Sequence, residues 1–269
     1  MPAAPPPPIT DCHTHAFPDD LAARAIPALA AAGGVAPSHD GTIAGLLGAM
    51  DAAGIGRAVV CSIATRPSQF EAILSWSQSI ASDRIVPLAS IHPDDPNPAG
   101  RVAQVAAAGL AGLKVHPYYQ EFALDDPRAM AIYAAAADHG LLVTCHCGYD
   151  LAFPYDDRAA PARVQRVIDA LPQLRFVATH CGGWRAWDEV EALLLGRPLD
   201  IEISMTLGWT EPERVRRLLL GHDPGRLLFG SDAPWSEPAE ALQRLAELDL
   251  PAGLLDGLLR RNAARLLGF

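Results

Sequence analysis

Histidines in this sequence stand mainly at the ends of short apolar runs. Six of the nine do so, namely His13, His15, His92, His116, His146 and His180. Neutral imidazoles and a carboxylate are the ligands that a divalent first-row metal prefers, and Asp232 ends a further apolar run. Such an ion lowers the pKa of a bound water to about 7 and so generates a nucleophile at neutral pH. The residue types therefore indicate a catalytic metal centre.

The His13-Thr14-His15 motif suits two ligands of one ion. Side chains alternate along a strand, so both imidazoles point to the same side. The other three histidines are placed differently. His139 and His222 precede apolar runs, and His39 lies in an insertion between the first and second runs. Structural or solvated histidines would not gather at one end of the runs, and this one-sided placement favours a common site.

The apolar runs are predicted to be β-strands. Eight of them are β-rich, at residues 8–15, 57–64, 84–93, 110–117, 141–148, 175–182, 199–205 and 226–234. Continuous apolar runs are typical of parallel strands that are buried on both faces. Helical patterns occupy residues 18–32, 42–53, 127–139, 160–171, 184–195 and 211–221, and two more follow the last run at 236–246 and 251–267.

Eight strands alternating with helices predict an α/β fold, the (β/α)8 TIM barrel. No GxGxxG pattern follows the first run, which disfavours an open dinucleotide-binding sheet. In a TIM barrel the active site lies at the C-terminal ends of the strands, which is where the six histidines stand. Since no linker divides the chain, we expect a single domain over residues 9–269, after a Pro-rich lead-in at residues 1–8.

Composition narrows the choice of partners. The chain has 269 residues, 50% of them hydrophobic, and a formal net charge of -10. This acidic balance disfavours nucleic acids and anionic membrane surfaces as partners. No apolar stretch is long enough to span a membrane, and the N-terminus lacks the basic region of a secretory signal. We therefore expect a cytoplasmic protein with a small-molecule substrate and five reduced cysteines.

Several motifs together carry a resemblance to a known family. They are the HxH of residues 13–15, His146, THCGG at 179–183, FGSDAPW at 229–235, GLKVHP at 112–117 and the tail NAARLLG at 262–268. The first four resemble the amidohydrolase superfamily. The last two narrow the resemblance to the amidohydrolase-related (amidohydrolase 2) group, which also contains the aminocarboxymuconate-semialdehyde decarboxylase-like enzymes. The resemblance extends over residues 11–269.

This resemblance implies roles for particular residues. His13, His15, His146 and Asp232 match the metal-ligand positions of the family. His180 and Asp232 match catalytic positions, at which His180 would act on the metal-bound water and Asp232 would accept a proton. The expected cofactor is one divalent ion, Zn²⁺ or alternatively Mn²⁺.

Lys114 admits three interpretations. In binuclear relatives a lysine on the fourth strand is carboxylated and bridges two metals, whereas in the amidohydrolase-related group the same motif accompanies a single metal. With a single metal, we expect Lys114 to be a charge partner for the substrate. It could also be a structural lysine paired with Asp11 or Glu202, since buried charges need partners.

Further residues are candidates for contact with the substrate. The predicted substrate-binding residues are Phe17, Arg66, His92, Lys114, His116, Tyr119 and Trp235. Arg66 follows the second strand and could bind a substrate carboxylate through two hydrogen bonds. Aromatic side chains that follow the later strands suit an apolar or unsaturated substrate.

The sequence favours a metal-dependent hydrolase that acts on a small, carboxylated or cyclic substrate through a metal-activated water. The alternative is a non-oxidative decarboxylase of the same group, in which His180 would help to protonate the carbon that loses CO2. A nuclease with the same barrel is disfavoured by the net charge of -10 and the FGSDAPW motif. A binding protein without turnover is disfavoured by the complete set of strand-end residues. By analogy alone, related barrels favour a homodimer.

Overall fold

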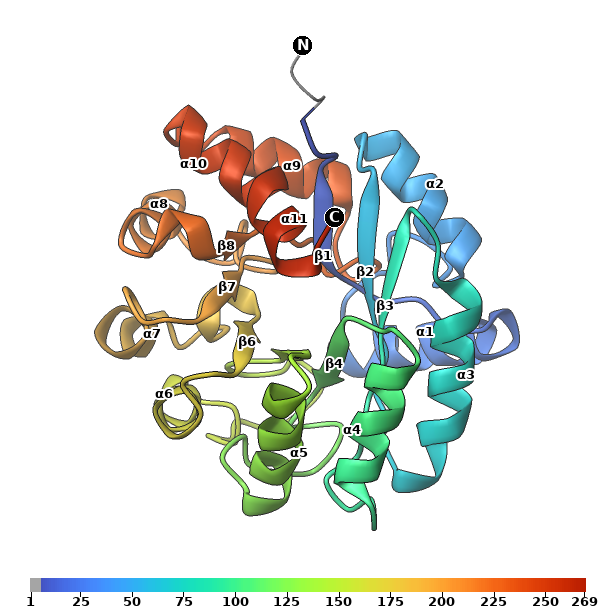
Figure 1. The fold of residues 1–269 in the computed structure, drawn as a ribbon. Coiled ribbons are helices and arrows are strands. Elements are labelled where there is room, and N and C mark those ends of the chain that lie inside the picture. The colour runs from blue at the N-terminus through green and yellow to red at the C-terminus, as the bar shows by residue number, and fades with distance from the viewer. Residues whose placement is uncertain (1–5) are drawn as a thin grey trace, which may run out of the picture.

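The computed structural model describes residues 6–269, so residues 1–5 of the predicted lead-in lie outside the description. Within this range the strands are β1 (Thr10–Thr14), β2 (Arg57–Cys61), β3 (Ile85–Leu88), β4 (Gly112–Val115), β5 (Leu142–Cys145), β6 (Arg175–Ala178), β7 (Asp200–Glu202) and β8 (Leu227–Leu228). Every paired strand runs parallel to its neighbour. Helices surround the strands (Figure 1).

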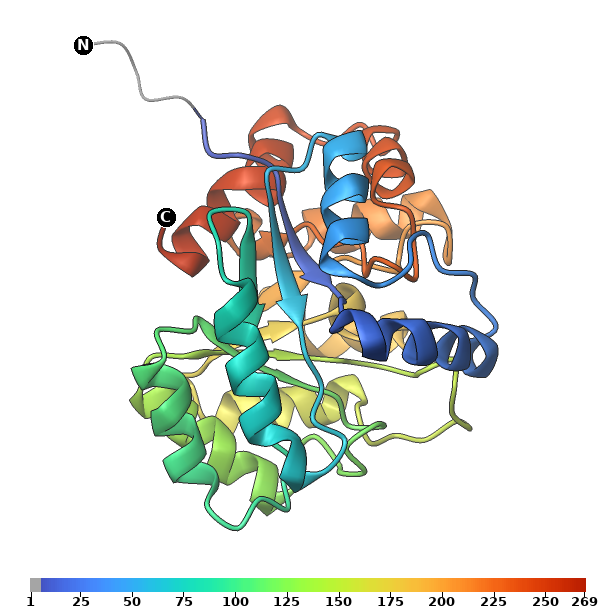
Figure 2. The same ribbon diagram turned by 90° about the vertical axis from the view of Figure 1, so that its right-hand side faces the viewer.

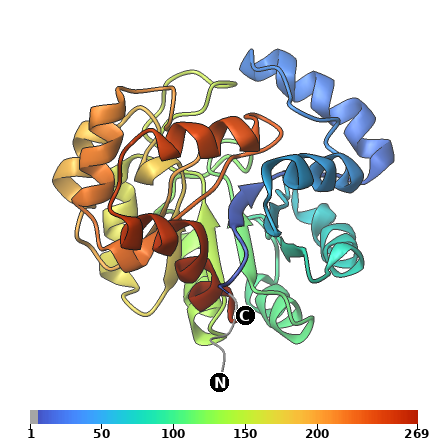
Figure 3. The ribbon, with the colours of Figure 1, turned by 90° about the horizontal axis from the view of Figure 1, so that it is seen from above.

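Two helices, α1 (Asp19–Gly33) and α2 (Ile43–Ala53), lie between β1 and β2 and form the predicted early insertion. The others are α3 (Phe70–Ile80), α4 (Pro98–Ala107), α5 (Pro127–Asp138), α6 (Pro161–Ala170), α7 (Trp187–Leu193), α8 (Pro212–Leu220), α9 (Pro238–Ala246), α10 (Ala252–Asp256) and α11 (Asn262–Leu267). Short turns are η1 (Pro67–Gln69), η2 (His180–Gly182) and η3 (Pro224–Arg226), and η4 (Gly257–Arg261) is π-helical. Helix α1 stands apart from the helices around the strands (Figure 3) and lies beside the end of β1 (Figure 2).

Local sequence signals account for the helix boundaries. Thr42 caps α2 by accepting a hydrogen bond from Gly45 N (2.9 Å), and Asp126 caps α5 by accepting one from Arg128 N (2.9 Å). Proline occupies the first turn of five helices, α4, α5, α6, α8 and α9, where its missing N–H costs no hydrogen bond. The predicted helices between the later strands are therefore confirmed.

The strands form two sheets, ordered β1-β2-β3 and β4-β5-β6-β7-β8, and backbone hydrogen bonds join these sheets at both edges. Between β3 and β4, Lys114 N donates to Ala89 O (2.8 Å). Between the segment after β8 and β1, Asp232 N donates to His13 O (2.8 Å). The buried hydrophobic side chains form one large cluster of strand and helix residues and one small cluster that draws mainly on the strands, and the predicted single-domain TIM barrel is confirmed.

Every strand ends earlier than the apolar pattern predicts, and the ends of β6 and β8 matter most for the site. The pattern extends to residues 182 and 234, whereas β6 ends at Ala178 and β8 at Leu228. His180 (φ 58°) and Asp232 (φ 65°) have left-handed backbone conformations, which residues other than glycine rarely adopt. The Asp11 carboxylate accepts hydrogen bonds from Ser231 N (2.9 Å) and Oγ (2.5 Å) and so holds the second turn against β1. Both candidate catalytic residues therefore lie on tight turns.

Burial follows the prediction for parallel strands covered on both sides. Every residue of β1, β4 and β5 is buried. The five cysteines are free and buried, as predicted, and behave as small core residues. Within residues 6–269, no helix combines the length and the apolarity that crossing a membrane requires.

A substitution at Gly112 would test the close contact between β4 and β5. A Cβ atom at this position would lie 2.2 Å from Leu142 O, and a backbone oxygen cannot move away without distorting the sheet. Gly112→Ala is therefore expected to lower the free energy of unfolding by about 2–3 kcal/mol in urea titrations. Gly48→Ala is the matched control, because nothing lies near its added Cβ in α2. It should leave stability unchanged or raise it by about 1 kcal/mol. Equal effects of the two substitutions would contradict this packing.

Candidate active site

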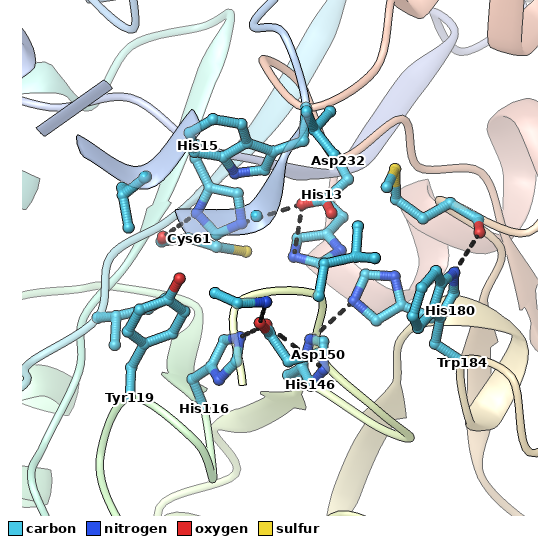
Figure 4. Close-up of a pocket in the computed structure, with 18 of the residues that line it drawn as sticks. His13, His15, Cys61, His116, Tyr119, His146, Asp150, His180, Trp184 and Asp232 are labelled. Carbon is cyan, nitrogen blue, oxygen red and sulfur yellow. Dashed lines mark hydrogen bonds and ion pairs between the residues drawn. The ribbon is translucent and has the colours of Figure 1, made fainter. Parts of the chain in front are cut away.

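A cavity of about 190 Å³ lies where the strands end (Figure 4). Much of its polar lining comes from β1, β2 and β4 and from the segments that follow β1, β4, β5, β6 and β8: His13, His15, Cys61, Lys114, His116, His146, Asp150, His180 and Asp232. Aromatic residues form much of the remaining wall: Phe17, Tyr119, Tyr149, Trp184 and Trp235. The carboxyl ends of the strands thus converge on one cavity, as a TIM barrel requires.

Hydrogen bonds fix the orientation of the two β1 histidines. His15 Nδ1 lies 2.9 Å from Cys61 O, the last residue of β2. His13 Nδ1 lies 3.0 Å from Glu202 Oε2, on β7. Ser204 supports this carboxylate, because its Oγ donates to Glu202 Oε2 (2.8 Å) and its N donates to Oε1. Both imidazoles therefore direct Nε2 towards the cavity and Asp232.

The histidines that follow β5 and β6 are also oriented by an acceptor at one ring nitrogen. His146 Nε2 lies 2.9 Å from Tyr149 O, and His180 Nδ1 lies 3.2 Å from Ser204 O. A carbonyl oxygen only accepts hydrogen bonds, so these nitrogens carry the hydrogens and the other nitrogen of each neutral ring is a bare lone pair. Those two bare nitrogens, His146 Nδ1 and His180 Nε2, face each other at 3.0 Å. Two lone pairs at this distance repel each other unless a cation lies beside them.

Asp232 completes the cluster. Its Oδ1 is buried and accepts no hydrogen bond from any described residue. It lies 3.1 Å from His15 Nε2 and 3.5 Å from His13 Nε2. Ligands bound to a tetrahedral metal at 2.0–2.1 Å lie about 3.4 Å apart, so these separations fit a shared cation. The residues present therefore suit a divalent metal.

Burial sets the protonation states that a metal needs. It lowers the pKa of His13, His146 and His180 well below the usual value, and the charge of Lys114 adds to this effect. These rings are accordingly neutral at pH 7, the form that coordinates metals. Burial raises the pKa of Glu202 to about 8, although the hydrogen bonds from Ser204 act in the opposite direction.

A second cluster lies beside the first and contains His116, His146 and Asp150. The His116 and His146 rings stack with centroids 4.1 Å apart, and His116 Nε2 lies 3.4 Å from Asp150 Oδ2. His180, rather than His146, groups with His13 and Asp232. His146 thus connects the two clusters, since its Nδ1 faces His180 and its Nε2 is 4.0 Å from Asp150 Oδ2.

Lys114 is the only lysine in the sequence and is completely buried. Its Nζ lies 2.8 Å from His13 Nε2. Neither Asp11 nor Glu202 forms an ion pair with it among the residues that the structure describes. Lys114 therefore contacts the cluster itself, and it also lines the cavity.

The cavity brings most of the predicted substrate-binding residues together. Phe17, His116, Tyr119 and Trp235 line it along with Lys114, whereas Arg66 and His92 do not. Arg66 is exposed at the start of η1, and His92 turns its Nδ1 to Asp94 N (3.1 Å). The sequence suggested no role at the site for Ser204 or Asp150, and it offered Glu202 only as a partner of Lys114. A charged residue between Ile201 and Ile203 in a buried run was the available signal for Glu202.

A model of the family described as "Amidohydrolase" matches residues 10–269. The chain belongs to the amidohydrolase family. This match covers all the strands and both clusters, in agreement with the resemblance of the strand-end motifs. No curated protein matches the chain.

Solved structures share the fold at low identity. An uncharacterised TIM-barrel protein from Bordetella bronchiseptica is 20% identical, with a TM-score of 0.81 over 97% of this chain and 98% of the other. A 5-carboxyvanillate decarboxylase from Novosphingobium aromaticivorans, solved with bound manganese, is 13% identical, with a TM-score of 0.72 over 97% of each chain. A probable 2-pyrone-4,6-dicarboxylic acid hydrolase from Acinetobacter baumannii is 17% identical, with a TM-score of 0.68 over 97% and 99%. Structures that share this fold thus include a decarboxylase and a probable hydrolase.

Removing a ligand tests the metal cluster. His13→Ala and His15→Ala each delete one of the two Nε2 atoms beside Asp232, and metal occupancy measured by plasma mass spectrometry should fall at least tenfold. His139→Ala is the control, because this histidine is exposed at the end of α5. Full occupancy in both ligand variants would contradict the assignment.

Glu202→Gln tests the support of His13. The substitution keeps the size of the side chain but replaces the carboxyl group that faces His13 Nδ1 with an amide, a weaker hydrogen-bond acceptor. Such orienting partners typically contribute 10- to 100-fold to metal affinity, and a loss of about this size is expected in metal titrations. Glu191→Gln, on the exposed face of α7, should bind metal as the unmodified protein does. Unchanged affinity in Glu202→Gln would show that this contact does not orient the ligand.

Proposed function

We propose that this protein is a metal-dependent hydrolase that acts on a one-ring organic substrate. The observation that carries the proposal is the convergence of bare imidazole nitrogens and the unpartnered Asp232 Oδ1 in one buried cluster. The proposed ligands are His13, His15, His146 and Asp232, with His180 beside them. Zn²⁺ is the proposed ion because the donors are mainly imidazole nitrogens, and Mn²⁺, which a structurally similar decarboxylase binds, is the alternative.

A divalent ion bound there would polarise a substrate carbonyl and lower the pKa of a bound water. The protein's own groups would complete the chemistry. Asp232 Oδ1 has a free acceptor site and would take the proton that the water releases. The neutral His180 would relay that proton to the leaving group. Lys114 carries the positive charge beside His13 that would hold an anionic oxygen of the substrate.

The cavity limits the substrate to about one ring. An engineered protein cavity of about 150 Å³ holds benzene, so about 190 Å³ accommodates a small substituted ring. Aromatic side chains supply flat apolar walls for such a ring. Arg66 lies outside the cavity, and any substrate carboxylate would therefore meet the metal and Lys114.

Decarboxylation is the second candidate, and His116 is the observation that favours it. Its imidazole lines the cavity outside the metal ligands, and its Nδ1 is buried without a hydrogen-bond partner among the described residues. A ring carbon that loses CO2 takes up a proton, and an imidazole that does not bind the metal would transfer one to it. The fold shared with a 5-carboxyvanillate decarboxylase adds a carboxylated phenol to the compounds worth testing.

A product assay with the metal-loaded protein separates the two reactions. Ring lactones and amides, 2-pyrone-4,6-dicarboxylate among them, report hydrolysis, whereas CO2 release from 5-carboxyvanillate and other carboxylated phenols reports decarboxylation. We expect hydrolysis without CO2 release. CO2 release without any hydrolysis would replace the hydrolase proposal with the second candidate.

Asp232→Asn tests the proton acceptor. The amide keeps the shape of the side chain but cannot accept a proton, so kcat should fall by roughly 10²- to 10⁴-fold. Asp157→Asn, at an exposed site in the loop before α6, serves as the control and should keep full activity. Metal content is measured for both variants. Undiminished kcat in a metal-loaded Asp232→Asn protein would rule out this role.

A further inference from the structure

A carboxylate outside the metal ligands lies in the cavity wall, at Asp150. It belongs to the loop between β5 and α6, and only 13% of its side chain is exposed. Ala152 N donates to its Oδ1 (2.8 Å), and this contact fixes the carboxylate. Oδ2 consequently faces the stacked rings of His116 and His146, at 3.4 and 4.0 Å from their Nε2 atoms.

No lysine or arginine balances this charge. Of the described residues that line the cavity, Lys114 alone is a lysine or arginine, and its Nζ lies at the metal cluster, 2.8 Å from His13 Nε2. The ion pairs of Asp150 among residues 6–269 involve only His116 and His146. The nearby Arg158 pairs instead with Asp156 and lies over the ring of Tyr118. This end of the cavity is therefore rich in acceptors and poor in positive charge.

A second metal ion fits this cluster less well than its composition suggests. Because Tyr149 O accepts from His146 Nε2, that nitrogen carries a hydrogen and offers no lone pair towards Asp150. The bare nitrogen of His146 faces His180 and the first cluster. Only His116 and Asp150 remain to face the cavity at this point, too few ligands for a divalent ion.

The cavity thus has two different ends. In Figure 4, His13, His15 and Asp232 lie on one side of the pocket, and Asp150 lies with His116 and His146 on another. Tyr119 packs beside His116, with ring centroids 4.7 Å apart, and gives the Asp150 end a flat apolar wall. A one-ring molecule whose reacting group meets the metal cluster would place a substituent beside Asp150.

We infer that Asp150 and His116 form a subsite that selects ring substrates with a hydrogen-bond donor, an amino or hydroxyl group, and rejects those with a second carboxylate. A donor on the ring would give its hydrogen to Asp150 Oδ2, and such charge-assisted bonds are about twice as strong as neutral ones. A carboxylate there would meet a like charge with no lysine or arginine to offset it. The inference rests on the proposed function for the orientation of the ring.

Binding of substituted benzoates to the metal-loaded protein tests this subsite by calorimetry. The probes are benzoate, 3- and 4-aminobenzoate, 3- and 4-hydroxybenzoate, isophthalate and terephthalate. We expect at least one aminobenzoate or hydroxybenzoate to bind about tenfold or more tightly than the dicarboxylate with the same substitution pattern. In Asp150→Asn this ratio should fall to near one, while the affinity for benzoate changes less than twofold.

The variants are chosen to preserve the loop. Asparagine keeps an Oδ1 that accepts from Ala152 N, and Asp150→Ser provides a second variant with a shorter acceptor. Asp157→Asn, in the same loop, should keep the selectivity of the unmodified protein. Thermal unfolding and metal content are recorded for each variant.

Three results would overturn the subsite. The first is an unchanged selectivity ratio in Asp150→Asn and Asp150→Ser. The second is no binding of any probe by a protein that loads metal normally. The third is a metal content of two ions per chain that falls to one in Asp150→Asn, which would assign the cluster to a cation. Failure of the proposed function would give a different result. The protein would bind no metal or would turn over no substrate, while the ratio of probe affinities would still depend on Asp150.

Discussion

The site depends on how each imidazole is held by the nitrogen that points away from the cavity. Backbone carbonyls of Cys61, Tyr149 and Ser204 accept from His15, His146 and His180. An acceptor of this kind decides which nitrogen carries the hydrogen, and burial keeps the His146 and His180 rings neutral by lowering their pKa. The other ring nitrogens carry lone pairs that are enclosed in the protein. Those of His146 and His180 face each other and repel unless a cation lies beside them.

The barrel supplies this constraint through its backbone. The bond from Asp232 N to His13 O joins the last strand segment to the first, and the same segment carries Asp232 Oδ1 to within 3.1–3.5 Å of two imidazoles. The Asp11 carboxylate accepts hydrogen bonds from Ser231 and so stabilises the junction between β1 and the segment after β8. The hydrogen bond that joins the two sheets at this edge therefore also positions Asp232 beside the two imidazoles. A substitution that disturbs this edge is expected to disturb the ligand cluster as well.

Much of the fold and part of the site could be predicted from the sequence. The position of a residue at a strand end depends only on the apolar pattern and on the fold. The His13–His15 pair follows from strand alternation, whereas the ligand role of Asp232, which lies on a turn beyond β8, is implied by the family resemblance. The positions that depend on loop paths could not be predicted in this way. Asp150 is four residues beyond the last strand-end histidine on its segment, and nothing in its neighbours indicates that it turns back to His116. Arg66, likewise on a loop, turns to solvent.

The distribution of charge connects the fold to substrate choice. Only 19% of the residues are charged, and the cavity concentrates two carboxylates and one lysine at different points of its wall. The central claim, that the histidine cluster coordinates a metal, is tested most directly by X-ray absorption spectroscopy at the metal edge of the purified protein. The account predicts at least three imidazole ligands and a carboxylate oxygen at about 2.0–2.2 Å. A sulfur ligand from Cys61, or fewer than two imidazoles, would contradict it.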